Sequence, residues 1–220
     1  RGFVHARARY TMENRKIKLI IFDLDDTLYD EKKYVKSGFK ASALFLERKT
    51  GIPSARIYKK LLDSFRKFGR GKNFNIVLDH FGISHVAIKD MVRIYQRHTP
   101  DIQISKRVRA TLRHLEQNYK LCLITNGWPW VQKKKIDSLG LRRIFNLVLY
   151  AEENGHRFKK PHKKYFIKAM RHFRVRPHEV LVAGDDPVAD GEGAKSVGVA
   201  FILIHTPGDI KKVLAYAKRN

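Results

Sequence analysis

Two aspartates, Asp23 and Asp25, follow the apolar run 17–22 at a spacing of two residues. A charged carboxylate is rarely buried unless it is paired or bound to a metal ion. Several acids at one strand end repel one another unless a cation neutralises them, and carboxylate oxygens are ligands that suit Mg²⁺. The pair therefore indicates a magnesium site. Taken alone, Asp25 and Asp26 could instead cap a helix or turn after the strand.

Three later segments place polar residues of complementary chemistry at further strand ends. They are Thr125 at the end of the run 121–125 with Asn126 after it, Lys160 before Pro161, and Asp185 with Asp186 and Asp190 after the run 180–184. Acids that hold a divalent cation, together with a hydroxyl and an ammonium that hold an oxyanion, are the groups that phosphoryl transfer needs. The ordered set is far more specific than any one member.

Five apolar runs are the candidate strands that must position these groups: 17–22, 121–125, 145–150, 180–184 and 199–204. Each is hydrophobic throughout, which is typical of strands buried on both faces of a parallel sheet. Helical patterns at 131–139, 163–173, 189–197 and 209–217 lie between or after the later runs. The pattern predicts an α/β fold, a doubly wound parallel sheet with its site at the carboxyl ends of the strands.

Nearly a hundred residues separate the first two runs, and they have helical rather than strand character. We expect helices at 32–49, 54–68, 73–80 and 86–97, with breaks at 51–53, 69–71 and 82–84. This predicts a helical-bundle cap at 31–99, inserted into a Rossmann-like core formed by 12–30 and 100–220. Residues 1–11 precede Met12 and are interpreted as a leader or an added extension outside the fold.

The four motifs, in this order, resemble those of the haloacid dehalogenase-like hydrolase superfamily across residues 17–204. The surrounding residues fit as well: Thr125-Asn126-Gly127 leads to Gln132 and to Leu139-Gly140-Leu141. The long insertion between the first and second motifs resembles the phosphatase branch with a helical cap in the first position. The stretch between Thr125 and Lys160 is too short for a large α/β cap in the second position.

The resemblance implies a role for each motif residue. Asp23 would be the nucleophile and Asp25 the general acid and base. Mg²⁺ would be held by Asp23, the Asp25 backbone carbonyl and Asp185, while Asp190 would support Lys160. The implied phosphate-binding set is Asp23, Leu24, Asp25, Thr125, Asn126 and Lys160. Two choices stay open: Asp186 could take the place of Asp190, and the adjacent Lys159 could take that of Lys160.

The formal net charge of +25 would attract polyanions. Residues 154–178 contain nine Lys or Arg and no acid, but part of this stretch reads as the solvated face of a helix. The leading hypothesis is a Mg²⁺-dependent phosphatase acting on a small phosphorylated metabolite. The alternatives are a basic nucleic-acid-associated protein or polynucleotide-end phosphatase, and then a phosphomutase or a haloacid dehalogenase. Asp25 disfavours the last, because family dehalogenases lack that acid.

The remaining expectations concern surroundings and partners. No apolar stretch approaches the roughly 20 residues that cross a bilayer, and the basic start lacks the apolar region of a signal peptide. The single cysteine, Cys122, lies in an apolar run and leaves no intrachain disulfide. We therefore expect a cytoplasmic protein without membrane contact, and a monomer is favoured.

Overall fold

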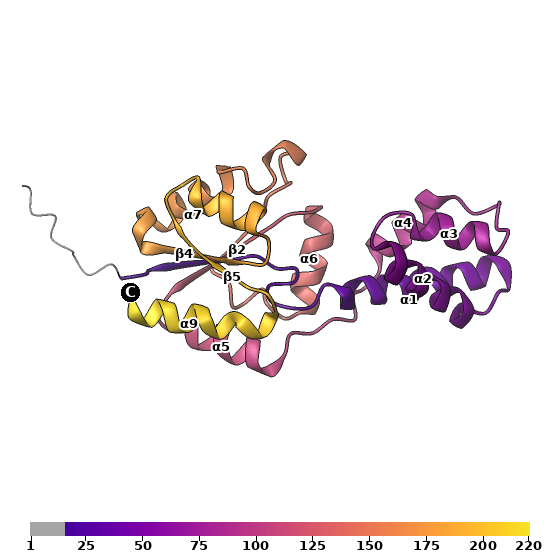
Figure 1. The fold of residues 1–220 in the computed structure, drawn as a ribbon, viewed down its shortest axis with the longest axis horizontal. Helices are drawn as coiled ribbons and strands as arrows, with labels where there is room; N and C mark the ends of the chain where they lie inside the picture. The colour runs from indigo at the N-terminus through magenta and orange to yellow at the C-terminus, as the bar shows by residue number, and fades with distance from the viewer. Residues whose placement is uncertain (1–15) are drawn as a thin grey trace, which may run out of the picture.

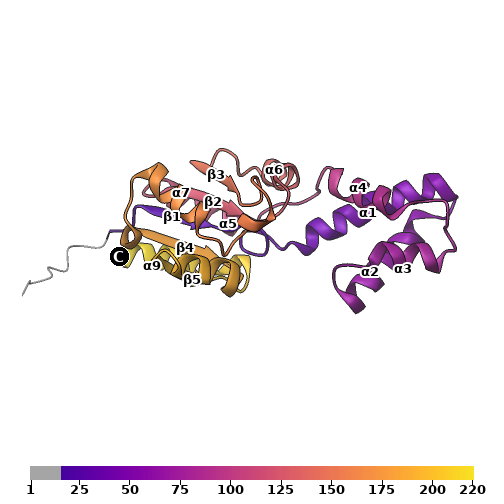
Figure 2. The ribbon, with the colours of Figure 1, turned by 90° about the horizontal axis from the view of Figure 1, so that it is seen from above.

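The computed structural model describes residues 16–220; the predicted leader at 1–11 lies outside this range. The core is a parallel sheet of five strands in the order β3-β2-β1-β4-β5 (Figures 1 and 2). The strands are β1 Leu19–Phe22, β2 Lys120–Thr125, β3 Leu147–Tyr150, β4 Val180–Gly184 and β5 Ala200–Leu203. The predicted α/β fold is confirmed; β1, β3 and β5 are each two residues shorter than expected, and β2 is one residue longer.

The central strand β1 is paired on both edges, and its residues alternate between two apolar layers. Ile20 lies between Leu121 of β2 and Leu181 of β4 in the register of the sheet. Ile20 points into the layer covered by α5 Lys106–Glu116, α6 Pro129–Ser138 and α9 Ile210–Arg219. Ile21 points to the other side, against α7 Lys164–Phe173. Because both faces are buried, the strand has no polar alternation.

Two helical segments differ from the sequence-based expectation. Helix α5 was not predicted, although Ser105 accepts a hydrogen bond from Val108 N as an N-cap and Val108, Leu112 and Leu115 are buried on one face. The helix expected at 189–197 is instead a π-helical turn, Pro187–Glu192, followed by the short α8 Gly193–Lys195. Within residues 16–220, no helix combines the length and apolar character required to cross a membrane.

The segment between β1 and β2 contains four further helices that form a unit of their own. They are α1 Lys32–Thr50, α2 Ser54–Phe68, α3 Asn73–His80 and α4 Ile88–Arg97. Except for Tyr34, their buried apolar residues form a cluster separate from the two layers of the sheet. This helical unit lies beyond the carboxyl ends of the strands (Figures 1 and 2). Residues of both parts line a cavity between them.

The separate core of the helical unit leads to a stability prediction. Leu61 of α2 is fully buried in that core, so Leu61→Ala is expected to lower the free energy of unfolding by about 2–5 kcal/mol through lost contacts and the cavity left behind. Hydrogen exchange should accelerate in α2, α3 and α4 more than in β1 and β2. Leu44→Ala is the matched control because Leu44 is 44% exposed on α1, and it should cost less than about 0.5 kcal/mol. Equal costs at both positions would contradict the assignment of a separate core.

Candidate active site

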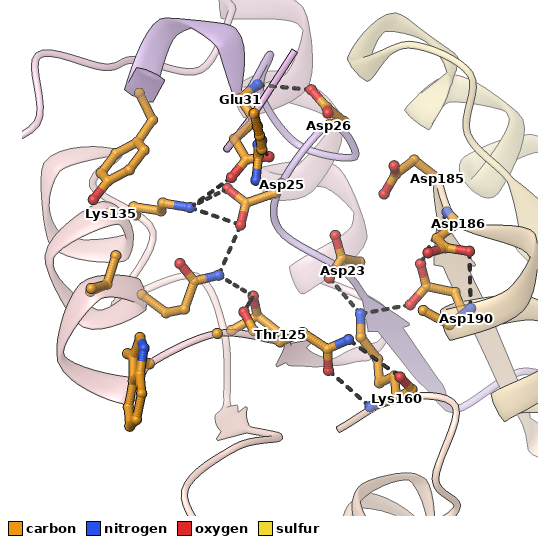
Figure 3. A pocket seen from close by; sticks show the side chains of 18 of the residues that line it. Asp23, Asp25, Asp26, Glu31, Thr125, Lys135, Lys160, Asp185, Asp186 and Asp190 are labelled. Atoms are coloured by element: carbon orange, nitrogen blue, oxygen red, sulfur yellow. Dashed lines mark hydrogen bonds and ion pairs between the residues drawn. The ribbon is translucent and has the colours of Figure 1, made fainter. Parts of the chain in front are cut away.

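The ends of three strands and the loop that carries Lys160 converge on one cavity of about 450 Å³. Asp23 and Asp25 follow β1, Thr125 ends β2, Lys160 lies in the loop after β3, and Asp185 follows β4. Figure 3 shows these side chains around the same space. In an open parallel sheet the carboxyl ends of the strands form such a crevice where neighbouring connections diverge. The site residues predicted from the sequence are therefore brought together.

Lys160 is buried between two carboxylates. Its ammonium lies 2.5 Å from Asp23 Oδ1 and 2.7 Å from Asp190 Oδ1, and only 3% of its side chain is exposed. Burial alone would lower the pKa of Lys160, but the carboxylates of Asp23 and Asp190 raise it above its ordinary value. Lys160 is therefore a fixed positive charge beside Asp23.

The carboxylates in this part of the site outnumber the cations. Oxygen atoms of Asp23, Asp185 and Asp190 all lie within 4.8 Å of one another, and Lys160 supplies a single positive charge. Burial raises the pKa of Asp23 to about 8, with Asp190 and Asp25 adding to the rise against the effect of Lys160. Burial and Asp190 likewise raise the pKa of Asp185 to about 6. Hard oxygen donors carrying excess negative charge are what a divalent cation such as Mg²⁺ requires, so the residues fit a metal site.

The structure gives Asp186 and Asp190 different surroundings. The Asp186 carboxylate accepts hydrogen bonds from Val188 N and Ala189 N at the start of the π-helical turn, which is the role of an N-cap. Asp190 instead points back to Lys160, and it lies against Gly184, where a side chain would collide with its carboxylate. Asp190 is farther than Asp186 from Asp185 along the sequence, yet it is Asp190 that contacts Lys160. Lys159 is exposed, whereas Lys160 is buried.

The end of β2 contributes polar groups to the cavity wall. Thr125 is buried, and its hydroxyl accepts a hydrogen bond from Gln132 Nε2 at 2.5 Å. The Asn126 side chain accepts a hydrogen bond from Lys160 N at 2.8 Å, which ties the lysine loop to this strand end. Leu24 is fully buried, so only its backbone can take part in phosphate binding. These contacts place Thr125 and Lys160 on neighbouring walls of the cavity.

Asp25 is held on the other side of Asp23 by a separate set of contacts (Figure 3). Its carboxylate accepts hydrogen bonds from Lys135 Nζ at 2.8 and 2.9 Å, Gln132 Nε2 at 2.9 Å and Tyr29 OH at 2.5 Å. Burial would raise the pKa of Asp25, but the Lys135 ammonium and these hydrogen bonds lower it below the ordinary value. Asp23 and Asp25 thus have opposite electrostatic surroundings although they are two residues apart.

The sequence analysis missed Lys135, Glu31 and Arg70. Lys135 contacts Asp25 and also lies 3.2 Å from Glu31, which precedes α1 and pairs with Arg70 of the helical unit. A signal for Lys135 existed in the pattern of α6. Val131 and Ile136 define the buried face of that helix, and Gln132 and Lys135 lie on the same face. Polar side chains at apolar positions of a helix are candidates for a buried site.

Several aromatic residues lie in or near the cavity. Trp128 lines the cavity and is 53% exposed, while Trp130 does not line it. Tyr34 and Tyr95 of the helical unit also line the cavity and pack against each other edge to face, with ring centroids 5.5 Å apart. Part of the cavity wall is therefore aromatic.

The chain is similar in sequence to a known hydrolase family and to several phosphatases. The sequence model of the family described as haloacid dehalogenase-like hydrolase matches residues 20–204. A glyceraldehyde 3-phosphate phosphatase from Pyrococcus furiosus is 31% identical over 201 residues, covering 86% of this chain and 80% of the relative. A ribulose-1,5-bisphosphate 5-phosphatase from Halopiger xanaduensis is 28% identical, covering 84% of this chain and 83% of the relative.

Among solved structures, a subfamily IA hydrolase from Geobacter sulfurreducens has a similar fold, with a TM-score of 0.62 at 21% identity. The alignment covers 90% of this chain and 96% of that one. The family model extends over most of the described chain and includes the three strand ends and the Lys160 loop that line the cavity. This protein belongs to the haloacid dehalogenase-like hydrolases.

Proposed function

We propose that this protein is a Mg²⁺-dependent phosphatase that hydrolyses a small phosphorylated metabolite through an aspartyl-phosphate. The observation that carries the proposal is the position of Asp23. Its carboxylate borders the cavity, bonds to the Lys160 ammonium and lies within 4.8 Å of oxygens from Asp185 and Asp190. A carboxylate so placed can attack a phosphoryl group whose negative charge is balanced on several sides.

The reaction would proceed in two displacements at phosphorus. In the first, an Asp23 oxygen forms a bond to phosphorus as the bond from phosphorus to the leaving oxygen breaks. In the second, water attacks the phosphorus of the aspartyl-phosphate, which releases inorganic phosphate and restores the Asp23 carboxylate. Lys160 would stay protonated in both steps and stabilise the charge on the phosphoryl oxygens.

Several groups of this chain would bind the phosphoryl oxygens. The Thr125 hydroxyl and the backbone amides of Leu24 and Asn126 would donate hydrogen bonds to them. Asp23, Asp185 and the Asp25 backbone carbonyl would hold Mg²⁺, which supplies the positive charge that a phosphoryl group needs to accept an anionic nucleophile. Asp190 would keep Lys160 oriented toward Asp23, in line with their 2.7 Å contact.

Asp25 would transfer the protons. Because Lys135 lowers the pKa of Asp25 in the free protein, Asp25 would take up a proton as the phosphate anion binds beside it. It would give this proton to the leaving oxygen in the first displacement and take one from the attacking water in the second. The Gln132 amide bonds to both Asp25 and Thr125, so the Asp25 carboxylate lies next to the proposed phosphate site. Two distinct carboxylates for attack and for proton transfer favour hydrolysis of a phosphate ester over displacement of a halide.

The cavity size and the relatives support a small substrate. Glyceraldehyde 3-phosphate and ribulose-1,5-bisphosphate are the compounds in the names of the two relatives, and both are short-chain sugar phosphates. The helical unit would act as a cap, excluding water and contacting the part of the substrate remote from phosphorus. Trp128 and the Tyr34 and Tyr95 rings offer apolar surface on that side.

The deciding experiment measures phosphate release from 4-nitrophenyl phosphate and from a panel of sugar phosphates, nucleotides and phosphorylated oligonucleotides. Turnover with Mg²⁺, with preference for three- to five-carbon sugar phosphates, supports the proposal. Preference for phosphorylated oligonucleotide ends would favour the polynucleotide alternative. No phosphate release from any compound at saturating Mg²⁺ would overturn the phosphatase assignment.

Removal of the metal gives a second expected result. Dialysis against EDTA should abolish turnover, and added Mg²⁺ should restore it, because Lys160 alone leaves the carboxylates around Asp23 with excess negative charge. The metal should also raise the melting temperature, since ligand binding to the folded state stabilises it. Asp185→Asn should weaken the dependence of both activity and melting temperature on Mg²⁺ concentration. Full activity in EDTA would contradict a metal-dependent mechanism.

A further inference from the structure

Lys135 is a buried lysine whose ammonium contacts the Asp25 carboxylate. Only 4% of its side chain is exposed, and its ammonium bonds to both Asp25 oxygens and to Glu31. Its Nζ also lies 4.3 Å from the centroid of the Tyr34 ring, which shields the ammonium from water. Burying a lysine is costly unless its charge has a partner, and a hydrophobic side chain would fill the same position on α6. The position therefore calls for a reason beyond packing.

The contacts to Lys135 fix the direction of Asp25. Two hydrogen bonds from one ammonium to both oxygens of a carboxylate restrict its rotation. Gln132 adds a third contact and joins Asp25 to Thr125, while Tyr29 adds a fourth. Gln132 and Lys135 are on the same face of α6, a helix anchored in the core through Val131 and Ile136. The helix is thus a rigid support for the Asp25 side chain.

We infer that Lys135 is a positioning residue that fixes the Asp25 carboxylate beside the phosphate site for proton transfer to the leaving oxygen. The inference rests on the proposed phosphatase function. The contact between Lys135 and Glu31 also connects α6 to the start of α1. Arg70 of the helical unit pairs with the same Glu31. Lys135 therefore lies where the core meets the helical unit (Figure 3).

A comparison of two leaving groups separates positioning from a structural role. Phenyl phosphate and 4-nitrophenyl phosphate have similar shapes, but phenolate is a far poorer leaving group and needs the proton from Asp25. In Lys135→Met, kcat/KM should fall by about 10²-fold or more for phenyl phosphate and at least about tenfold less for 4-nitrophenyl phosphate. Because kcat/KM reports the first irreversible step, slow hydrolysis of the aspartyl-phosphate does not mask the difference.

Further variants complete the test. Lys133→Met is the matched control, because Lys133 is exposed on the same helix. It should leave kcat/KM unchanged for both esters. Lys135→Arg should recover part of the phenyl phosphate activity, since a guanidinium can bond to Asp25 and Glu31 together. Lys135→Gln keeps a hydrogen-bond donor and serves if Lys135→Met does not fold. In an Asp25→Asn background, removing Lys135 should no longer change the ratio between the two substrates.

The outcomes are distinguishable from failure of the proposed function. If the unaltered protein with Mg²⁺ hydrolyses neither ester, the phosphatase proposal fails and the inference falls with it. If the unaltered protein hydrolyses both and the Lys135 variants lose activity equally on both, or lose none, the inference alone is overturned. A selective loss on phenyl phosphate that disappears in the Asp25→Asn background supports it.

Discussion

The Asp23→Asn variant is expected to lose about 10⁴-fold or more in kcat while it stays folded, as happens when a nucleophile is removed. An amide oxygen cannot form the aspartyl-phosphate, so both displacements are blocked rather than slowed. The fold should tolerate the change, because Asp23 is one of three closely spaced carboxylates around a single ammonium. Removing one negative charge reduces their repulsion, and Lys160 keeps Asp190 as its partner.

The measurement combines single-turnover kinetics with thermal unfolding in EDTA. The metal-free Asp23→Asn protein should melt at the same temperature as the unaltered protein or above it. Asp26→Asn makes the same chemical change three residues on and is the matched control. Asp26 has a φ of 54° and accepts a hydrogen bond from Glu31 N, and asparagine tolerates that backbone region and can accept the same bond. Turnover retained by Asp23→Asn would remove Asp23 as the nucleophile.

The Lys160→Met variant is expected to show the second large effect, on both activity and stability. Loss of the ammonium leaves Asp23 and Asp190 buried without their shared partner. Breaking a buried ion pair from one side costs about 3–5 kcal/mol of unfolding free energy. The phosphoryl group would also lose a cation, so kcat should fall by about 10³-fold or more.

Two comparisons sharpen this result. Lys159→Met removes an exposed neighbouring lysine and should change the unfolding free energy by less than about 0.5 kcal/mol. Adding Asp190→Asn to Lys160→Met removes one unpaired buried charge, so part of the lost stability should return while turnover stays low. Denaturant unfolding in EDTA gives the free energies. If Lys159→Met rather than Lys160→Met abolished activity, the assignment of the catalytic lysine would be wrong.

The sequence predicted the sheet because its strands are buried on both faces. Continuous apolar runs such as 180–184 have few alternatives to a parallel sheet covered by helices. Helix α5 was missed for a physical reason: charged residues separate its apolar positions Val108, Leu112 and Leu115, so the segment has low overall hydrophobicity. The π-helical turn after β4 was not predicted. Its Asp190 side chain lies against Gly184 and reaches Lys160, and this long-range contact is not visible in the local sequence.

The residues of the proposed site that lie at strand ends could be predicted from the sequence. The residue that a helix contributes, Lys135, was harder to predict. Asp23, Thr125 and Asp185 each follow an apolar run, so the topology alone places them at one edge. Lys135 has no such mark. It lies among three consecutive lysines at 133–135, and only its spacing from Val131 and Ile136 on α6 indicates that it is the one that faces inward. Long-range partners such as Glu31 and Arg70 depend on how the helical unit rests on the core.

The position of β1 at the centre of the sheet has a consequence for synthesis of the chain. Its two neighbours are β2, which begins at Lys120, and β4, which begins at Val180. A nascent chain or proteolytic fragment that stops before Val180 leaves one side of β1 as an open edge of apolar residues, a known route to aggregation. It also lacks Asp185 and Asp190. Premature termination should therefore yield insoluble, metal-free fragments rather than a weakly active enzyme.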